Sequence, residues 1–188
     1  MPVNAPLAGL PDVTLPLGEL VPRFQRHYFT GPADIRFFKS RCFTFGRSVQ
    51  YMPLVRAFLD TCAAERDTDY RYLFTLLGSE LANNALTHSR SGEPYGFYTL
   101  KCERRDNGLR LTCRDQGSKH TDQASRPNRF EHLTTCASRL TSDAESGRGL
   151  AMIDSLASSW GDNGFTGTRQ VWFFLAGDLS GSSWNSLL

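Results

Sequence analysis

Three polar side chains, Glu80, Asn84 and His88, recur at every fourth position of a segment whose apolar residues follow a helical period. On a helix they form one row, which Leu73 and Leu77 continue, so the row belongs to the stripe that should face the interior. Burying an unpaired carboxylate or amide is costly, and something polar must therefore meet these groups. A carboxylate base beside an amide oxygen that holds Mg²⁺ would suit phosphoryl transfer. Taken alone, the row also fits an internal hydrogen-bond network or an exposed helix end.

A second candidate is the tripeptide Asp115-Gln116-Gly117, which directly follows a β-rich run. A chain that leaves a sheet can direct a carboxylate into a pocket, and glycine allows a ligand to approach the backbone closely. Taken alone, the tripeptide is more typical of an ordinary Asp-x-Gly turn.

Two glycine-rich segments complete the set of candidates. Ser146-Gly147-Arg148-Gly149-Leu150 opens a helical pattern, and the free N–H groups of a helix start together with an arginine would hold phosphates. Gly164-Phe165-Thr166-Gly167-Thr168 leads into the last β-rich run. Singly, the first segment is equally often a flexible joint and the second fits a simple turn.

The elements that position these residues are read from periodicity and turn signals. In chain order they are a helix from 48 to about 62, a helix from about 70 to 88, a hairpin of 95–102 and 109–113, a helix through Phe130, Leu133, Ala137 and Leu140, a helix from about 150, and a strand over 169–175. Asp106-Asn107-Gly108 is a strong hairpin signal, and Pro53 falls in a first helical turn, where a missing N–H is harmless. Helices and antiparallel strands together predict an α/β two-layer sandwich with helices on one face of a mostly antiparallel, mixed sheet.

The length of 188 residues predicts one folded domain, over 45–176, with additions at both ends. Residues 1–44 hold six of the nine prolines and predict an irregular extension. This extension is too apolar to stay unpacked, so we expect it to dock through aromatic residues, namely Phe24, Tyr28, Phe29, Phe37 and Phe38. The tail over 177–188 is small and polar and is expected to fray.

Composition excludes several classes of protein. The net charge is only +2 and the basic residues are scattered, so no nucleic-acid partner is predicted. No apolar run is long enough to span a membrane and no signal peptide opens the chain, so a cytoplasmic protein is expected. The five cysteines are odd in number and include no C-x-x-C pair, which argues against a disulfide framework and a zinc site. They are expected to be small buried hydrophobes.

The four candidate segments stand in a fixed order along the chain, which is more specific than any one of them. Ser79-Glu-Leu-Ala-Asn-Asn84-Ala-Leu-Thr-His88, Arg114-Asp-Gln-Gly117, Gly147-Arg-Gly-Leu150 and Gly167-Thr168 resemble the N, G1, G2 and GT boxes of the GHKL, or Bergerat-fold, ATPases. The chain looks most like the bacterial anti-sigma-factor serine/threonine kinases of that superfamily, over about residues 43–175. The resemblance implies the histidine kinase-like ATPase fold and two cofactors, ATP and Mg²⁺.

The resemblance also implies roles for individual residues. Asp115 would receive the adenine amino group, and Gly117 would keep the base pocket open. Asn84 would bind Mg²⁺, and Glu80 would orient or deprotonate the attacking nucleophile. The remaining implied contacts to the nucleotide come from Gly147, Arg148, Gly149 and Leu150, which close over the phosphates, and from Thr168, which supports the pocket.

Two positions depart from the pattern or stay open. Many relatives carry another glycine or proline just after the D-x-G tripeptide, whereas this chain has Ser118-Lys119-His120. The role of His88 is undetermined, and a structural role near the helix end fits it equally well.

The resemblance implies a kinase that phosphorylates a serine or threonine on a STAS-type anti-anti-sigma protein, or sequesters a sigma factor, or both. It leaves open whether the chain forms a homodimer. The alternative is a non-catalytic module that uses ATP to grip a partner protein, and only Glu80 separates the two hypotheses. The catalytic half of a histidine kinase is disfavoured, because no dimerisation and phosphoacceptor helix precedes the domain in this sequence.

Overall fold

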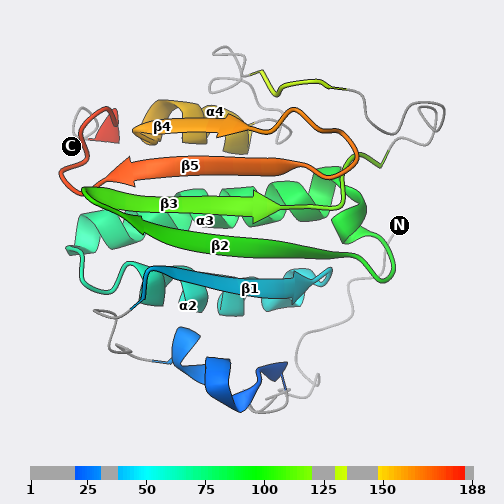
Figure 1. Cartoon of the computed structure of the whole chain (residues 1–188), viewed down its shortest axis with the longest axis horizontal. Coiled ribbons are helices and arrows are strands. Elements are labelled where there is room, and N and C mark those ends of the chain that lie inside the picture. The colour runs from blue at the N-terminus through cyan, green and yellow to red at the C-terminus, as the bar shows by residue number, and fades with distance from the viewer. Residues whose placement is uncertain (1–19, 31–37, 120–129, 135–147, 185–188) are drawn as a thin grey trace, which may run out of the picture.

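The computed structural model describes residues 20–30, 38–119, 130–134 and 148–184, which form a two-layer α/β sandwich (Figure 1). Five strands form one open sheet in the order β1-β2-β3-β5-β4, and each neighbouring pair is antiparallel. The helices α2, α3 and α4 cover one face of this sheet. In chain order the elements are η1 (Arg23–Tyr28), β1 (Ser40–Gly46), η3 (Val49–Tyr51), α2 (Met52–Cys62), α3 (Thr68–His88), η4 (Arg90–Gly92), β2 (Phe97–Arg105), β3 (Gly108–Arg114), α4 (Arg148–Leu156), β4 (Ser159–Asp162) and β5 (Gln170–Ala176). The predicted fold class is confirmed.

The long helix α3 is fixed at both of its ends. Asp67 caps its N-terminus by accepting the N–H of Tyr70 at 2.8 Å, and the chain turns extended at Ser89 after the last helical residue. The buried Tyr70 hydroxyl donates to the carbonyl of Leu175 at 2.7 Å and accepts the N–H of Leu109 at 3.1 Å. One side chain therefore ties the start of α3 to two strands of the sheet.

Close packing at Gly78 sets the position of α3 against its neighbours. A methyl group at residue 78 would stand 2.7 Å from Leu59 of α2 and 2.9 Å from Leu111 of β3. Only a residue without a side chain fits there, so α3 approaches both layers closely. This placement directs the C-terminal half of α3 toward the ends of β3 and β5.

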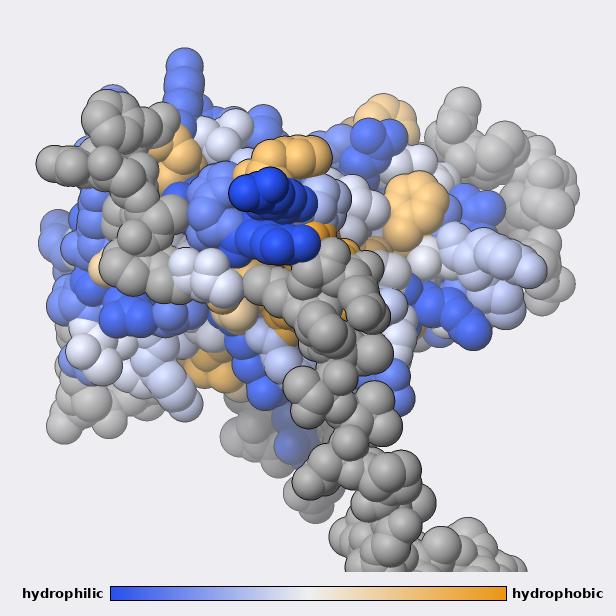
Figure 2. Space-filling model, turned by 90° about the horizontal axis from the view of Figure 1, so that it is seen from below, coloured by the Kyte–Doolittle hydropathy of each residue, from blue (hydrophilic) through white to orange (hydrophobic). Residues whose placement is uncertain are grey.

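The part of the N-terminal extension that the structure describes is docked on the domain. Phe29 is buried and packs its ring against Phe43 at 4.9 Å and Phe58 at 6.1 Å, between centroids. The hydroxyl of Thr61 donates to the Tyr28 carbonyl. Seen from below the view of Figure 1, the described surface is mostly hydrophilic, with separate hydrophobic residues among the hydrophilic ones (Figure 2). Docking through aromatic side chains is thus seen for part of the predicted set, whereas Phe24 is exposed and Phe37 lies outside the described residues.

Several local predictions differ from the structure. Strand β1 begins at Ser40, inside the segment predicted to be irregular, and the short strand β4 was not predicted at all. Residues 130–134 do not form the predicted helix, because Phe130 pairs as a β-bridge with Phe165 and the Glu131 N–H donates to the Gly164 carbonyl at 2.7 Å. The other half of that predicted helix, with Ala137 and Leu140, lies outside the described residues.

The end of the chain also differs from the expected frayed tail, as far as residue 184. Leu179 is buried, the Ser182 hydroxyl donates to the Leu156 carbonyl at 2.5 Å, and the Ser183 N–H donates to the Ser155 carbonyl at 3.2 Å. The apolar side chains at 179 and 184 anchor this segment on the helical layer.

The cysteines follow the prediction in part. Cys62, Cys102 and Cys113 are buried, whereas Cys42 is exposed on β1, and Cys136 lies outside the described residues. No helix of the described chain is both long enough and apolar enough to pass through a lipid bilayer.

Candidate nucleotide site

A cavity of about 450 Å³ lies where the C-terminal half of α3 meets the ends of β3 and β5. The segment 130–134 and the first turn of α4 complete its walls. Its volume falls within the usual range of about 300 to 1,000 Å³ for small-molecule pockets. The apolar part of the wall is formed by Leu81, Ala85, Leu133, Leu150 and Val171.

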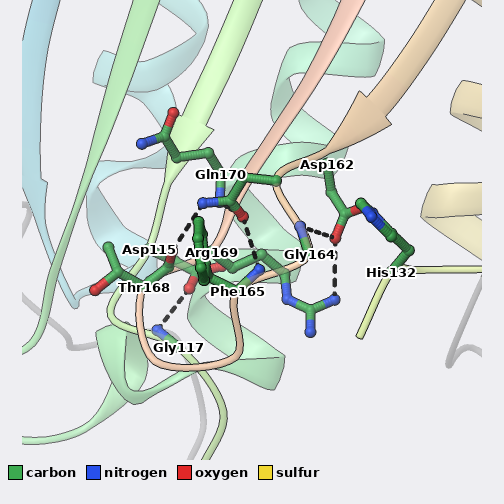
Figure 3. Close-up of polar contacts among 10 residues, drawn as sticks. Asp115, Gly117, His132, Asp162, Gly164, Phe165, Thr168, Arg169 and Gln170 are labelled. Carbon is green, nitrogen blue, oxygen red and sulfur yellow. Dashed lines mark hydrogen bonds and ion pairs between the residues drawn. The ribbon is translucent and has the colours of Figure 1, made fainter. Parts of the chain in front are cut away.

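Asp115 lies at one side of this cavity, directly after β3 (Figure 3). Its backbone N–H donates to the Arg169 carbonyl at 2.9 Å, which continues the pairing of β3 with β5 for one more residue. Its Oδ1 accepts the N–H of Gly117 at 2.7 Å. Burial raises the pKa of the Asp115 carboxyl above its ordinary value. A carboxylate accepts more than one hydrogen bond, so it retains capacity for an amino group in the cavity.

Gly117 makes the turn beneath this carboxylate possible. Its φ of 79° lies in the left-handed region that favours glycine. A methyl group at residue 117 would also collide with the Thr166 carbonyl and stand 2.6 Å from the carbonyl carbon of Gly167. The chain before β5 therefore lies directly against Gly117, and no larger residue fits between them.

A polar network around Asp162 supports the same end of the sheet (Figure 3). The nearly buried Asp162 carboxylate lies 2.7 Å from Nδ1 of His132, accepts the Gly164 N–H at 3.2 Å and pairs with Arg169 at 3.5 Å. These bonds join His132 and Arg169, both of which line the cavity, to the turn at Gly164 before β5. Sequence reasoning missed this network. The only local signal for it was the turn-forming Asp162-Asn163-Gly164 run.

Glu80 and Asn84 face the start of α4 from adjacent turns of α3. A methyl group at Gly149 would stand 2.6 Å from Oε2 of Glu80 and 3.3 Å from Nδ2 of Asn84. Glu80 is half-buried, and this burial raises the pKa of its carboxyl above the ordinary value. The first N–H groups of a helix have no partner within the helix, so the α4 start can meet anionic oxygens beside these two side chains.

The other predicted site residues are distributed around this centre. Leu150 and His88 line the cavity, and Arg148 is the first, exposed residue of α4. Thr168 lines a neighbouring cavity of about 640 Å³, which shares Asp115 with the first, so its role as a support of the nucleotide pocket stays a prediction. Gly147 lies outside the described residues.

The residues present fit a nucleotide with a divalent cation. The apolar wall suits the flat faces of a purine, and the Asp115 carboxylate suits its exocyclic amino group. The Asn84 amide oxygen is a hard donor of the kind that Mg²⁺ prefers, and it lines the cavity beside the start of α4.

The comparison with protein families agrees with this geometry. Residues 47–165 match the family model of the histidine kinase-like ATPase domain. No curated protein matches the chain significantly. Since the family model spans more than half of the 188 residues and the cavity suits a nucleotide, the chain belongs to the family of histidine kinase-like ATPase domains, which implies that it binds ATP.

Proposed function

We propose that this ATPase-family domain is a protein serine/threonine kinase of the partner-switching type, which uses Mg²⁺ and ATP. Its target would be a serine or threonine on a STAS-type antagonist, and it would also be able to sequester a sigma factor. We base this on one observation: the Glu80 carboxylate lies beside Asn84, opposite the first turn of α4. A binding module needs Asn84, Asp115 and the glycines, but it has no need of a half-buried carboxylate there.

In the proposed reaction each side chain acts through its position. Asp115 and the apolar wall hold the base, Asn84 holds the cation, and the start of α4 faces the phosphates. With MgATP bound, the γ-phosphoryl group would bond to the acceptor hydroxyl oxygen as the bond from its phosphorus to the β,γ-bridging oxygen breaks. ADP would leave, and Glu80 would take up the hydroxyl proton. Burial raises the pKa of the Glu80 carboxyl above its ordinary value, which makes the carboxylate a stronger base than that of an exposed glutamate.

The experiment that tests this proposal compares wild type with Glu80→Gln on a true protein substrate. Partners retained with and without ATP are isolated, and phosphoserine and phosphothreonine on them are measured by mass spectrometry. Glutamine keeps the size and hydrogen bonding of glutamate but accepts no proton, so transfer should fall about 10² to 10⁴-fold while nucleotide affinity changes little. Glu93→Gln, at an exposed glutamate outside the nucleotide cavity, is the matched control.

The alternative function is an ATP-dependent binding module without catalysis. A wild type that binds ATP and retains its partner, yet leaves no phosphate on it, would establish the alternative. The same conclusion would follow if Glu80→Gln behaved as wild type in every assay.

A further inference from the structure

A second hollow of about 540 Å³ runs along the outer side of the helical layer, between α2 and α3. We call it the α2–α3 groove, and its lining residues are Arg56, Asp60, Thr68, Arg71, Tyr72, Thr75, Leu76, Ser79 and Glu80. The exposed Tyr72 and the partly buried Leu76 give it an apolar centre. It shares no lining residue with the nucleotide cavity.

Glu80 stands between these two hollows. It ends the groove along α3, while Asn84, one turn further on, lines the nucleotide cavity. Both side chains also face Gly149 at the start of α4. The carboxylate proposed as the base is therefore open to the groove on one side and adjoins the phosphate end of the nucleotide site on the other. A hydroxyl that enters along the groove would meet this carboxylate first.

The groove has the length of a short peptide. Its lining along α3 runs from Thr68 to Glu80, a distance of about 18 Å on a helix. At about 3.3 Å per residue, an extended chain places about five residues over that length. The hollow is thus too long for a single side chain and suits a segment of backbone with its side chains.

The charges on the rim favour an acidic side chain near the acceptor. Asp60 and Arg71 neutralise each other in a two-pronged ion pair, with Nη2 of Arg71 at 2.7 and 2.8 Å from the two carboxylate oxygens. Arg56 is exposed and has no ion pair with a described residue. Asp60 of α2 lies beside Arg71 near the start of α3, and the two helices run antiparallel, so Arg56 lies one helical turn closer to Glu80 than Asp60 does. The distance along the groove from Arg56 to Glu80 corresponds to about two to three residues of an extended chain.

We propose that the α2–α3 groove binds an extended segment of the protein substrate, with its serine or threonine hydroxyl at Glu80, an apolar side chain over Leu76 and an acidic side chain at Arg56. This inference rests on the proposed kinase function and names the surface that selects the acceptor. Tyr72, Leu76 and Arg56 are specificity residues, and none of them lines the nucleotide cavity.

The test uses an array of serine-centred nonapeptides in which aspartate or lysine is placed at each position in turn. The full chain is assayed on it twice, once with γ-labelled MgATP for transfer and once with Mg²⁺ and a non-hydrolysable ATP analogue for binding. Wild type should prefer peptides with aspartate about two or three positions from the serine, on one side only. Arg56→Glu should move that preference to lysine at the same position, since only the rim charge is reversed.

Leu76→Arg should reduce both peptide binding and transfer by at least tenfold, because it fills the apolar centre of the groove. Affinity for MgATP, measured by calorimetry, should stay within about twofold of wild type in each variant. The matched controls are Arg47→Glu and Val49→Arg, which make the same kinds of change at exposed positions outside the groove. Both controls should keep the wild-type peptide preference.

The two hypotheses fail in different ways. If the wild type transfers phosphate to peptides and Arg56→Glu and Leu76→Arg do so with unchanged rate and preference, the groove is not the peptide site, and the kinase function stands. Selective peptide binding without transfer would support the groove and overturn the kinase. A wild type that binds MgATP but neither binds nor modifies any peptide would overturn the groove as a peptide site.

Discussion

Gly149 and the Glu80 carboxylate face each other across the contact between α3 and α4, so closely that a methyl group at residue 149 would stand 2.6 Å from Oε2. We therefore expect Gly149→Ala to displace the carboxylate. The fold should tolerate the change, because the nearest atom is the end of a flexible side chain. Phosphoryl transfer should fall by about tenfold to a hundredfold, since a shift of about 1 Å at a reacting group has effects of that size.

Transfer rate and thermal unfolding measured on the same preparation check this prediction. Gly78→Ala is the comparison, since its methyl group would enter the packed core beside Leu59 and Leu111 and lower stability by about 1 to 3 kcal/mol. If the loss of transfer rate relative to the loss of thermal stability were the same in Gly149→Ala as in Gly78→Ala, displacement of Glu80 would not explain the loss of transfer.

Removing the Asp115 carboxylate should weaken nucleotide binding more than any other single change in the apolar end of the cavity. Asp115→Ala deletes a charged acceptor for the adenine amino group, a hydrogen bond worth about 1.5 to 3 kcal/mol, so the Kd for ATP or ADP should rise about tenfold to a hundredfold. Calorimetry with Asp106→Ala, in the exposed hairpin turn, as the control would measure this. No detectable nucleotide binding by the wild type would contradict the assignment of the site.

As the pH is lowered, nucleotide affinity should begin to fall at a higher pH than it would if Asp115 were an exposed aspartate. Burial raises the pKa of the Asp115 carboxyl above its ordinary value of 3.8, so the side chain takes up its proton at a higher pH as the solution is acidified. The protonated group no longer offers a charged acceptor to an amino donor. The Kd of wild type measured against pH should therefore rise below this raised pKa, whereas Asp115→Asn should lack that part of the pH dependence. Parallel curves for the two proteins would refute it.

Glu80→Gln should raise the free energy of unfolding modestly at neutral pH. Burial raises the pKa of the Glu80 carboxyl above 4.5, so ionisation costs more in the folded state than in the unfolded state. That cost is absent below the unfolded pKa, where the group is neutral in both states, and is complete above the folded pKa. Because the group is only half-buried, water screens the effect and we expect a small one. Denaturation at pH 7 and at pH 4 should show the stabilisation mainly at pH 7, and an equal difference at both would contradict it.

Tyr70→Phe should destabilise the domain by about 1 to 3 kcal/mol. The change removes a buried hydroxyl and leaves the Leu109 N–H and the Leu175 carbonyl without that partner. Urea unfolding monitored by circular dichroism measures the loss, with Tyr95→Phe at an almost fully exposed tyrosine as the control. Equal stability of the two variants would show that water satisfies both backbone groups.

Long periodic segments were predictable from the sequence, because the spacing of apolar residues and turn residues within the segment itself indicates a helix or a hairpin. The patterns that placed α2, α3 and α4 and the hairpin β2–β3 are confirmed within a few residues at their ends. The short strand β4 was not visible, since Ser-Trp-Gly-Asp has neither the length nor the alternation of a strand. The helical prediction was wrong for residues 130–134, because Phe130 pairs with Phe165, which is distant in sequence.

The same contrast holds for the site. The four boxes placed Glu80, Asn84 and Asp115 around one end of α3, and the structure brings them to adjoining positions there. The network of Asp162, His132 and Arg169 depends on contacts between separate segments, which no local pattern encodes. The groove beside Glu80 was missed for the same reason, since it exists only where α2 lies along α3.

The described end of the chain places an aromatic reporter at the α2–α3 groove. The ring of Trp184 lies 5.9 Å from that of Tyr72, between centroids, and Tyr72 lines the groove. The other two of the three tryptophans are engaged elsewhere, with the Trp160 indole donating to Asp154 at 2.6 Å and Trp172 lying under the Arg110 guanidinium. Energy transfer from Tyr72 to Trp184 and the emission of Trp184 are therefore sensitive to what enters the groove. Intrinsic fluorescence offers a label-free way to follow its occupation in solution.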